Sequence, residues 1–79
     1  MIIKYCETLI RAEAVTRISL QENKLIVFFV NDDSRAYMYE GANGKAEAAM
    51  AFEKISAAFI KGEVCVDISP DLMELMLVF

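Results

Sequence analysis

The most reactive side chains in this sequence are the thiols of Cys6 and Cys65, and the sequence contains no histidine. A cysteine nucleophile usually depends on a neighbouring base, most often a histidine. Both cysteines lie in apolar stretches, where a thiol behaves as a small hydrophobic group. We therefore expect no catalytic cysteine and two free thiols. A Cys6–Cys65 disulfide is the alternative if the N-terminal and C-terminal strands are neighbours.

Two groups of acidic and polar residues have oxygen atoms spaced closely enough to raise the question of a cation site. The first is Asn31-Asp32-Asp33-Ser34, with Glu40 further along the chain, and the second is Asp67, Ser69 and Asp71 at alternate positions. Neither has the glycine and the distal glutamate of a calcium-binding loop. Asn, Asp and Ser are favoured in tight turns, and Ser followed by Pro is typical of a helix start. We therefore predict turn and capping roles, no bound metal and no cofactor.

A third group combines arginines with aromatic residues that we expect on one face of a sheet. It consists of Arg17, Phe28, Arg35, Tyr37 and Tyr39. Proteins that bind single-stranded RNA use such side chains for base stacking and backbone contact, but protein interfaces are also enriched in Tyr and Arg. The chain has eight basic and twelve acidic residues, a net charge of −4 and no basic tract, which argues against nucleic acid as the partner. We predict that this face contacts protein, either the N-terminal strand of its own chain or a second copy.

The C-terminal segment 72–79, LMELMLVF, is apolar at seven of its eight positions. If this segment is helical, Leu72, Leu75, Met76 and Phe79 share one side of it. The segment could complete the core of its own domain, but its apolar residues extend nearly all round, which favours docking on a second copy or on another protein. We predict an intermolecular contact through these four residues.

Three strands joined by two polar turns are expected to position the arginine and aromatic group. They cover residues 15–20, 24–30 and 35–40, and six consecutive apolar residues in the middle strand indicate burial on both sides. The turns are a two-residue loop at Glu22-Asn23 and a loop centred on Asp32-Asp33. This arrangement is an antiparallel β-meander.

The two loops fix the register of the meander, and the register assigns each side chain to a face. The predicted pairs include Val15–Val30, Leu20–Leu25, Phe28–Tyr37 and Ile26–Tyr39. One predicted face is almost wholly apolar and contains Thr16, Ile18, Leu20, Leu25, Val27, Phe29, Ala36 and Met38. The other face is mixed and contains Val15, Arg17, Ser19, Ile26, Phe28, Val30, Arg35, Tyr37 and Tyr39. We expect the apolar face to be the core side of the sheet.

A single long helix is predicted over residues 45–61, between a cap at Asn43 or Gly44 and a stop at Gly62. Apolar residues at helical spacing form one stripe on it, namely Ala48, Ala51, Phe52, Ile55, Ala58 and Phe59. Because three of these six residues are alanine, the helix can approach a sheet closely. We expect the stripe to pack on the apolar face of the meander.

The two ends of the chain add further β-structure. Residues 1–10 are expected to form a strand, with 8–10 either part of it or a separate short strand, and 11–14 a turn or a single helical turn. Residues 63–68 form a last strand, with Val64, Val66 and Ile68 on one face. The sequence thus predicts an α+β fold for a single small domain, residues 1–79. It is an antiparallel β-meander packed on one face by a single long α-helix, with an additional C-terminal strand and a short apolar C-terminal helix or arm.

Composition adds a prediction about assembly and location. The chain is 57% hydrophobic with a mean hydropathy of +0.38, and a domain of this size buries only about 60% of the surface that its unfolded chain exposes. Some apolar side chains must therefore be covered by a partner, and a homodimer is the simplest one. The first ten residues do not resemble a signal peptide, and the last apolar run is too short to cross a bilayer. We expect a cytoplasmic protein with no membrane contact.

These observations favour a small non-enzymatic protein-interaction module that forms a homodimer through the C-terminal segment or the aromatic sheet face. A phage-type or mobile-element inhibitor is the second hypothesis. It would use the acidic C-terminal region, which has no basic residue after Lys61, against a basic protein surface. A single-stranded RNA-binding sheet is the third. We expect no enzyme, because no paired base and nucleophile, metal-ligand set or phosphate-binding loop is present in the sequence.

Overall fold

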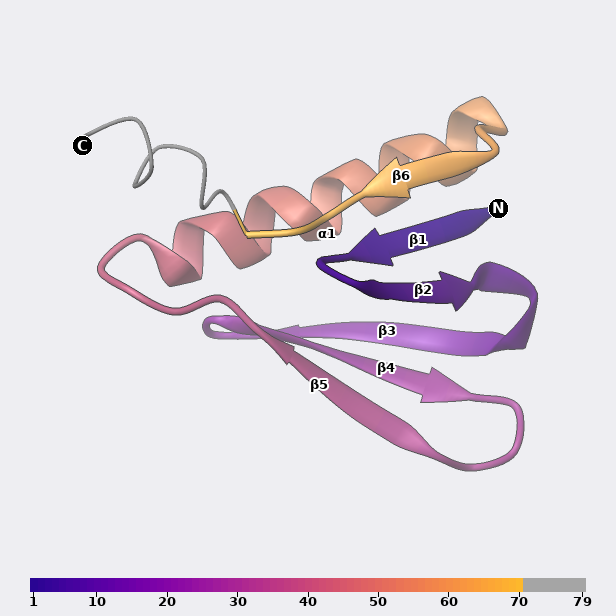
Figure 1. The fold of residues 1–79 in the computed structure, drawn as a ribbon, viewed down its shortest axis with the longest axis horizontal. Helices are drawn as coiled ribbons and strands as arrows, with labels where there is room; N and C mark the ends of the chain where they lie inside the picture. Colours follow the sequence, from indigo (N-terminus) through magenta and orange to yellow (C-terminus); the bar gives the residue numbers. More distant parts are fainter. Residues whose placement is uncertain (71–79) are drawn as a thin grey trace.

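The computed structural model describes residues 1–70, which fold into two three-stranded sheets and one long helix (Figure 1). The strand order is β2-β1-β6 in one sheet and β3-β4-β5 in the other. In chain order the elements are β1 (Ile2–Tyr5), β2 (Thr8–Arg11), a 3-10 turn η1 (Ala12–Ala14), β3 (Val15–Gln21), β4 (Lys24–Phe29), β5 (Ser34–Met38), α1 (Gly44–Lys61) and β6 (Cys65–Asp67). The predicted α+β fold with a meander, one long helix and a further strand is confirmed. The predicted C-terminal helix or arm with Leu72, Leu75, Met76 and Phe79 lies outside the described residues.

The N-terminal strand predicted over residues 1–10 is a hairpin of two antiparallel strands. β1 and β2 pair Ile3 with Ile10, and both side chains are buried. Cys6 lies in the tight turn between them, with a φ of 52°. β6 pairs in parallel with the other side of β1, so residues from both ends of the described chain share one sheet (Figure 1). The separate short strand near residues 8–10 and the helical turn that follows it are therefore confirmed.

Neither cysteine is buried, which contradicts the expectation that both pack as small hydrophobic groups. Cys6 lies in the hairpin turn, and Cys65 lies on the exposed side of β6. Ile2 is opposite Cys65 in the ladder, and Cys6 follows Ile2 by four positions, which places the two cysteines about 13 Å apart. A disulfide requires a Cα separation below about 7 Å, so both thiols are free although their strands are neighbours. Val64, predicted on the buried face of this strand, precedes β6 and is exposed.

The β3–β4 hairpin has the predicted register over most of its length. Near the start of β3 a bulge at Thr16 interrupts the ladder, so Val15 faces Phe29 and not Val30. The Thr16 hydroxyl donates a hydrogen bond of 3.1 Å to the carbonyl of Phe28. The bulge gives β3 one extra residue, which returns Val15 to the core side and leaves Thr16 exposed. The predicted faces are therefore wrong at these two positions.

The β4–β5 hairpin differs from the predicted register by three positions. Tyr37 lies opposite Leu25 and not opposite Phe28, because the connecting turn occupies residues 29–33 and not two residues alone. An odd shift moves every side chain of a strand to the other face of the sheet. Tyr37 and Tyr39 are therefore core residues, 7% and 1% exposed, and their predicted place on the mixed face is wrong.

The helix α1 confirms the prediction closely. It begins after Asn43 and ends at Gly62, which has a left-handed φ of 69°. The small residues of the predicted stripe are buried, namely Ala48, Ala51 and Ala58, together with Ile55. Phe59 is 55% exposed, because the alanines bring the helix so close to the sheet that a bulky ring at the margin of the stripe stays outside. Among residues 1–70, no helix is long and apolar enough to span a membrane.

Tyr39 connects the two sheets. Its hydroxyl donates a hydrogen bond to the carbonyl of Ile68, just beyond β6, and its N–H donates to the carbonyl of Asn23 at 2.8 Å. The ring of Tyr5 in β1 meets the rings of Tyr37 and Tyr39 edge to face, with centroids 5.0 and 5.7 Å away. Burial raises the pKa of Tyr39 well above its ordinary value, so this hydroxyl stays protonated and keeps donating.

Gly44, the first residue of α1, is required by a close approach to the end of β5. A Cβ atom at this position would lie 1.9 Å from the carbonyl oxygen of Tyr39. The side-chain amide of Asn23 donates to that same oxygen at 3.1 Å. The helix can therefore begin directly against Tyr39 only because Gly44 has no side chain.

We predict that Tyr39→Phe destabilises the fold. It removes the donor to Ile68 and leaves a buried carbonyl without that partner, which costs about 1–3 kcal/mol. For a domain of this size each kcal/mol lowers the melting temperature by roughly 4–8 °C, so thermal unfolding followed by circular dichroism measures the loss. The matched control is Tyr37→Phe, which removes a hydroxyl from the same aromatic cluster. Equal shifts in the two variants would contradict a special role for Tyr39.

We also predict that Gly44→Ala lowers the free energy of unfolding. Helix propensity favours alanine by about 1 kcal/mol, whereas forcing a methyl group into a filled space costs about 1–3 kcal/mol. Ala46→Gly, an exposed position in the same helical turn, reports propensity alone and should also destabilise. Urea unfolding of both variants separates the two effects. If Gly44→Ala raised stability while Ala46→Gly lowered it, propensity would dominate at Gly44.

Candidate functional site

The structure divides the predicted arginine and aromatic group among three places. Arg17 and Phe28 lie together on the face of sheet β3-β4-β5 that points away from the core, with the guanidinium carbon 4.1 Å from the ring centroid. This is a cation–π contact. Tyr37 and Tyr39 are buried in the core. Arg35 is exposed, but its register in β5 places it on the same side of the sheet as Tyr37. The predicted binding face therefore keeps two of its five members.

The outer face of sheet β3-β4-β5 is the first candidate surface. It consists of Arg17, Ser19, Gln21, Lys24, Ile26, Phe28, Ser34, Ala36 and Met38. Ile26 and Phe28 form its centre on β4 and are half-buried, and Met38 is 41% exposed. Among the described residues, no member of the buried core comes from this face. The face thus has an apolar centre, small residues beside it and two basic residues at its ends.

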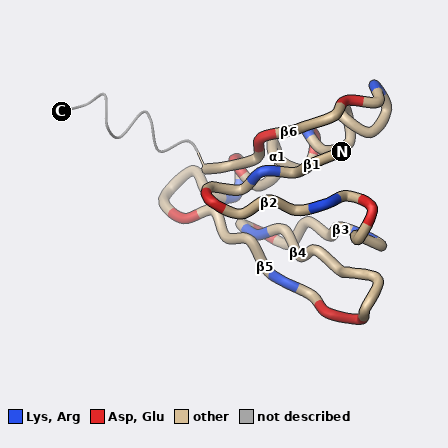
Figure 2. The backbone as a smooth tube through the Cα atoms, turned by 45° about the vertical axis from the view of Figure 1, so that its right-hand side comes forward, with Lys and Arg blue, Asp and Glu red and all other residues tan. Residues whose placement is uncertain are grey.

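The acidic segment Asn31-Asp32-Asp33-Ser34 has the turn role that the sequence predicted, whereas the helix start predicted from Ser69 to Asp71 extends outside the described residues. The side-chain amide of Asn31 donates to the Asp33 carboxylate at 3.2 Å, and the Asp33 N–H donates back to Asn31 at 3.3 Å. Asp32 adopts a left-handed φ of 68°, as turn residues of this type do. Within residues 1–70, no three His, Cys, Asp or Glu side chains lie close enough together to hold a metal ion. Figure 2 shows the basic and acidic residues interspersed over both sheets and the helix.

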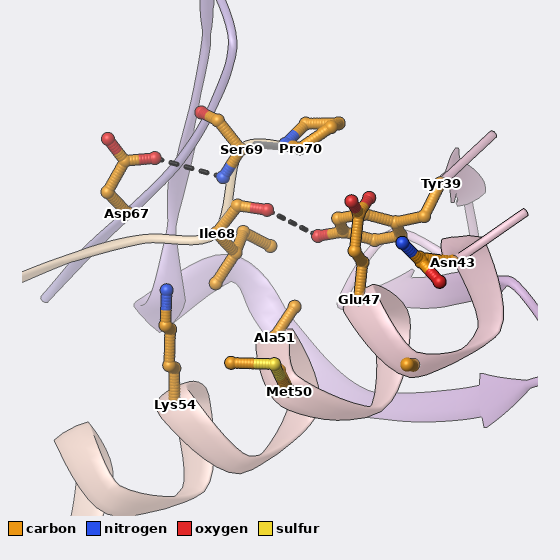
Figure 3. Close-up of a pocket in the computed structure, with 11 residues that line it drawn as sticks. Tyr39, Asn43, Glu47, Met50, Ala51, Lys54, Asp67, Ile68, Ser69 and Pro70 are labelled. Carbon is orange, nitrogen blue, oxygen red and sulfur yellow. Dashed lines mark hydrogen bonds between the residues drawn. The ribbon is translucent and has the colours of Figure 1, made fainter. Parts of the chain in front are cut away.

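A groove between α1 and the chain that follows β6 is the second candidate surface (Figure 3). Its volume is about 650 Å³. The residues that form its walls are Asn43, Glu47, Met50 and Lys54 on the helix side, Asp67, Ser69 and Pro70 on the strand side, and Tyr39 at one end. We call it the α1–β6 groove. It lies within the roughly 300–1,000 Å³ range of ligand-sized pockets.

The polar groups of the α1–β6 groove are engaged in holding the chain in place. The Asp67 carboxylate accepts a hydrogen bond from the Ser69 N–H at 2.9 Å, and hydrogen bonding with Ser69 lowers the pKa of Asp67. The Ser69 hydroxyl oxygen accepts from the N–H of Cys6 at 2.7 Å. Asp67 is therefore ionised and Tyr39 neutral over the physiological range, and neither is matched to proton transfer near pH 7.

A third, smaller hollow of about 210 Å³ lies on the other side of the helix, between β3 and α1. Val15 and Ile18 line it from the strand, and Phe52 and Phe59 line it from the helix. It is the margin of the helix–sheet contact, and it accounts for the exposure of the Phe59 ring. Its size suits one or two apolar side chains and not a larger ligand.

Sequence reasoning missed the α1–β6 groove entirely. Met50 gave the one available signal, because it is apolar and lies off the predicted helix stripe. The other wall could not be foreseen, because it depends on the parallel pairing of β6 with β1. Ser69 was predicted to cap a helix that would lie beyond residue 70, outside the described residues. Its hydroxyl instead accepts from the distant Cys6 N–H, and the prediction gave no indication that Asp67 and Ser69 border a groove.

Two surfaces are thus candidates for binding, the outer face of sheet β3-β4-β5 and the α1–β6 groove. The outer face is flat and apolar at its centre. The groove is concave and mixed in polarity. Comparisons with protein-family models, with curated proteins and with solved structures found no match to this chain.

Proposed function

We propose that this protein is a small non-enzymatic protein-interaction module that forms a homodimer through the outer face of sheet β3-β4-β5. The observation that carries the proposal is the apolar centre of this face, Ile26 and Phe28, which belongs to the middle strand and lies outside the core of the described residues. A contiguous apolar patch of this kind marks an interaction site more often than a solvated surface. The Arg17–Phe28 contact gives the patch a rigid aromatic anchor of the type that interfaces favour.

The face is self-complementary, which favours a second copy as the partner. A two-fold axis parallel to β4 would stack Ile26 and Phe28 on the same residues of the other copy. The same axis would place Ser19 of β3 opposite Ala36 of β5, and Arg17 opposite Ser34. Small side chains at these flanks allow two sheets to approach to about 10 Å. The arrangement keeps Arg17 away from its own symmetry mate, but it places Lys24, at the end of β4, beside its own copy, and this like-charge contact weakens the dimer.

The size of the face sets the expected affinity. Three strands spaced about 4.8 Å apart and about 17 Å long have a footprint of roughly 250 Å². This is small beside the roughly 800 Å² per partner of a standard interface. We therefore expect a weak dimer, with a dissociation constant in the micromolar range, that other contacts could strengthen.

The remaining chemistry of the described residues supports a binding role. Asp67 and Ser69 are held in structural hydrogen bonds, and Tyr39 is buried. The exposed free thiols of Cys6 and Cys65 fit a reducing compartment such as the cytoplasm.

The proposal is tested by placing a charge on the outer face. Ala36 is exposed on β5, so Ala36→Glu should leave the monomer folded while placing two carboxylates within the apolar contact. Light scattering coupled to size exclusion at about 100 µM should give twice the 8.9 kDa chain mass for the wild type and a mostly monomeric chain for Ala36→Glu, which at this concentration corresponds to a loss of at least about a hundredfold in affinity. The control is Leu9→Glu, an exposed apolar position on β2 in the other sheet, which should stay dimeric.

Two outcomes would overturn the proposal. A monomeric wild type at that concentration removes the homodimer, and equal effects of Ala36→Glu and Leu9→Glu remove the assignment to this face. The basic residues Arg17 and Lys24 make single-stranded RNA the competing occupant. A gel shift with oligouridylate at about 50 mM salt that disappears at higher salt would indicate RNA binding instead.

A further inference from the structure

The chain is fixed in position at the point where it leaves the described residues. The N–H of Ile68 donates to the carbonyl of Lys4 at 2.8 Å, and the Tyr39 hydroxyl donates to the carbonyl of Ile68. The hydroxyl oxygen of Ser69 accepts from the N–H of Cys6 at 2.7 Å. Pro70 follows immediately and forms part of the rim of the α1–β6 groove (Figure 3). The described chain therefore ends at the edge of this groove.

The groove has an uncovered apolar wall. Met50 is 61% exposed within residues 1–70, and Ala46 beside it is also exposed. Both lie off the buried stripe of α1, and the floor between them and the strand is the buried Ala51. The exposed part of the Met50 side chain forgoes the favourable free energy of burial, so an apolar occupant would be stabilised here.

The length and composition of the remaining chain suit this space. The groove follows α1 from Asn43 to Lys54, a rise of about 16 Å. Residues 71–79 would extend about 14 Å as a helix or about 30 Å as a strand, so a helix covers most of this length and a strand exceeds it. Seven of these nine residues are apolar, and the two others are acidic. The charged residues of the groove are Glu47, Lys54 and Asp67, so apolar burial and not charge complementarity favours this occupant.

We propose that residues 71–79 fold back into the α1–β6 groove of their own chain and cover Met50. A segment tethered at the rim has an effective concentration in the millimolar range, which exceeds the concentration of a second copy under ordinary conditions. The intramolecular contact therefore outcompetes the intermolecular docking that the sequence of Leu72, Leu75, Met76 and Phe79 also permits. This site is separate from the outer face of sheet β3-β4-β5, so the proposal for the groove does not depend on the proposed dimer.

Oxidation of methionine by hydrogen peroxide tests this proposal on the full chain. Met50 is more exposed than Met38 in residues 1–70, at 61% against 41%, so an open groove predicts that Met50 oxidises at least as fast. A covered groove predicts that Met50 oxidises at least about fivefold more slowly than Met38, measured by peptide mass spectrometry at about 1 µM. Any micromolar dimer that could protect Met38 is dissociated at that concentration.

Variants in the segment identify what covers Met50. The double substitution Leu72→Asp and Leu75→Asp should raise the oxidation rate of Met50 about fivefold and leave that of Met38 unchanged. The matched control, Glu74→Gln, keeps the apolar side chains and should retain the protection. Circular dichroism checks that each variant is folded. If the double variant unfolds, the proposal is judged from the ratio of the Met50 and Met38 oxidation rates in the wild type.

The proposal is overturned if Met50 in the wild type oxidises as fast as Met38, or if the double variant is folded and leaves Met50 protected. It is also overturned if the protection of Met50 weakens on dilution from 100 µM to about 1 µM, because a segment from a second copy would then be the occupant. Protection that is independent of concentration and lost in the double variant supports it.

Discussion

The buried phenol of Tyr39 is the constraint on which the rest of the described fold depends. Its hydroxyl holds Ile68 beyond the end of β6, and its backbone pairs with Asn23 before the start of β4. The helix α1 begins against its carbonyl oxygen, at a glycine that has no Cβ to clash with it. One residue therefore joins both sheets to the first turn of the helix. Because the site is dry, the hydrogen bond to Ile68 is strong and its loss is costly.

This constraint also shows why local sequence patterns predicted one hairpin and failed at the other. The β3–β4 register follows from a short turn at Glu22, which adopts a positive φ of 51°, and from the alternation beside it. The β4–β5 turn tolerates either of two lengths, because Asn and Asp suit both. What decides between them is the burial of Tyr39 against Ile68, 29 residues away. The registers of both hairpins were predicted from local patterns alone, so they contained no information about that distant contact.

In the helix and the candidate sites, too, features set by local sequence were predictable and features set by distant contacts were not. The stripe of α1 was predictable because its period is local, and only Phe59 at its margin was misplaced. The pair Arg17 and Phe28 was predictable because the β3–β4 register was right. Tyr37 was not, because its face depends on the longer turn. The α1–β6 groove was beyond reach because two elements remote in sequence form its walls, and only the pairing of β6 with β1 brings them together.

Because alanines make up much of the buried stripe of α1, the described core buries little apolar area and leaves other apolar side chains exposed to solvent. Ala48, Ala51 and Ala58 let the helix lie close to the sheets, but each buries little area, so the core of the described residues is thin relative to a chain that is 57% hydrophobic. Uncovered apolar side chains lie on the outer face of sheet β3-β4-β5 and in the α1–β6 groove, and also elsewhere on the described surface, as Leu9, Ile60 and Val64 do. Cover supplied by the same chain is independent of concentration, whereas cover supplied by a second copy is lost on dilution. Dilution would therefore expose the outer face before it exposed any apolar surface that the chain covers itself.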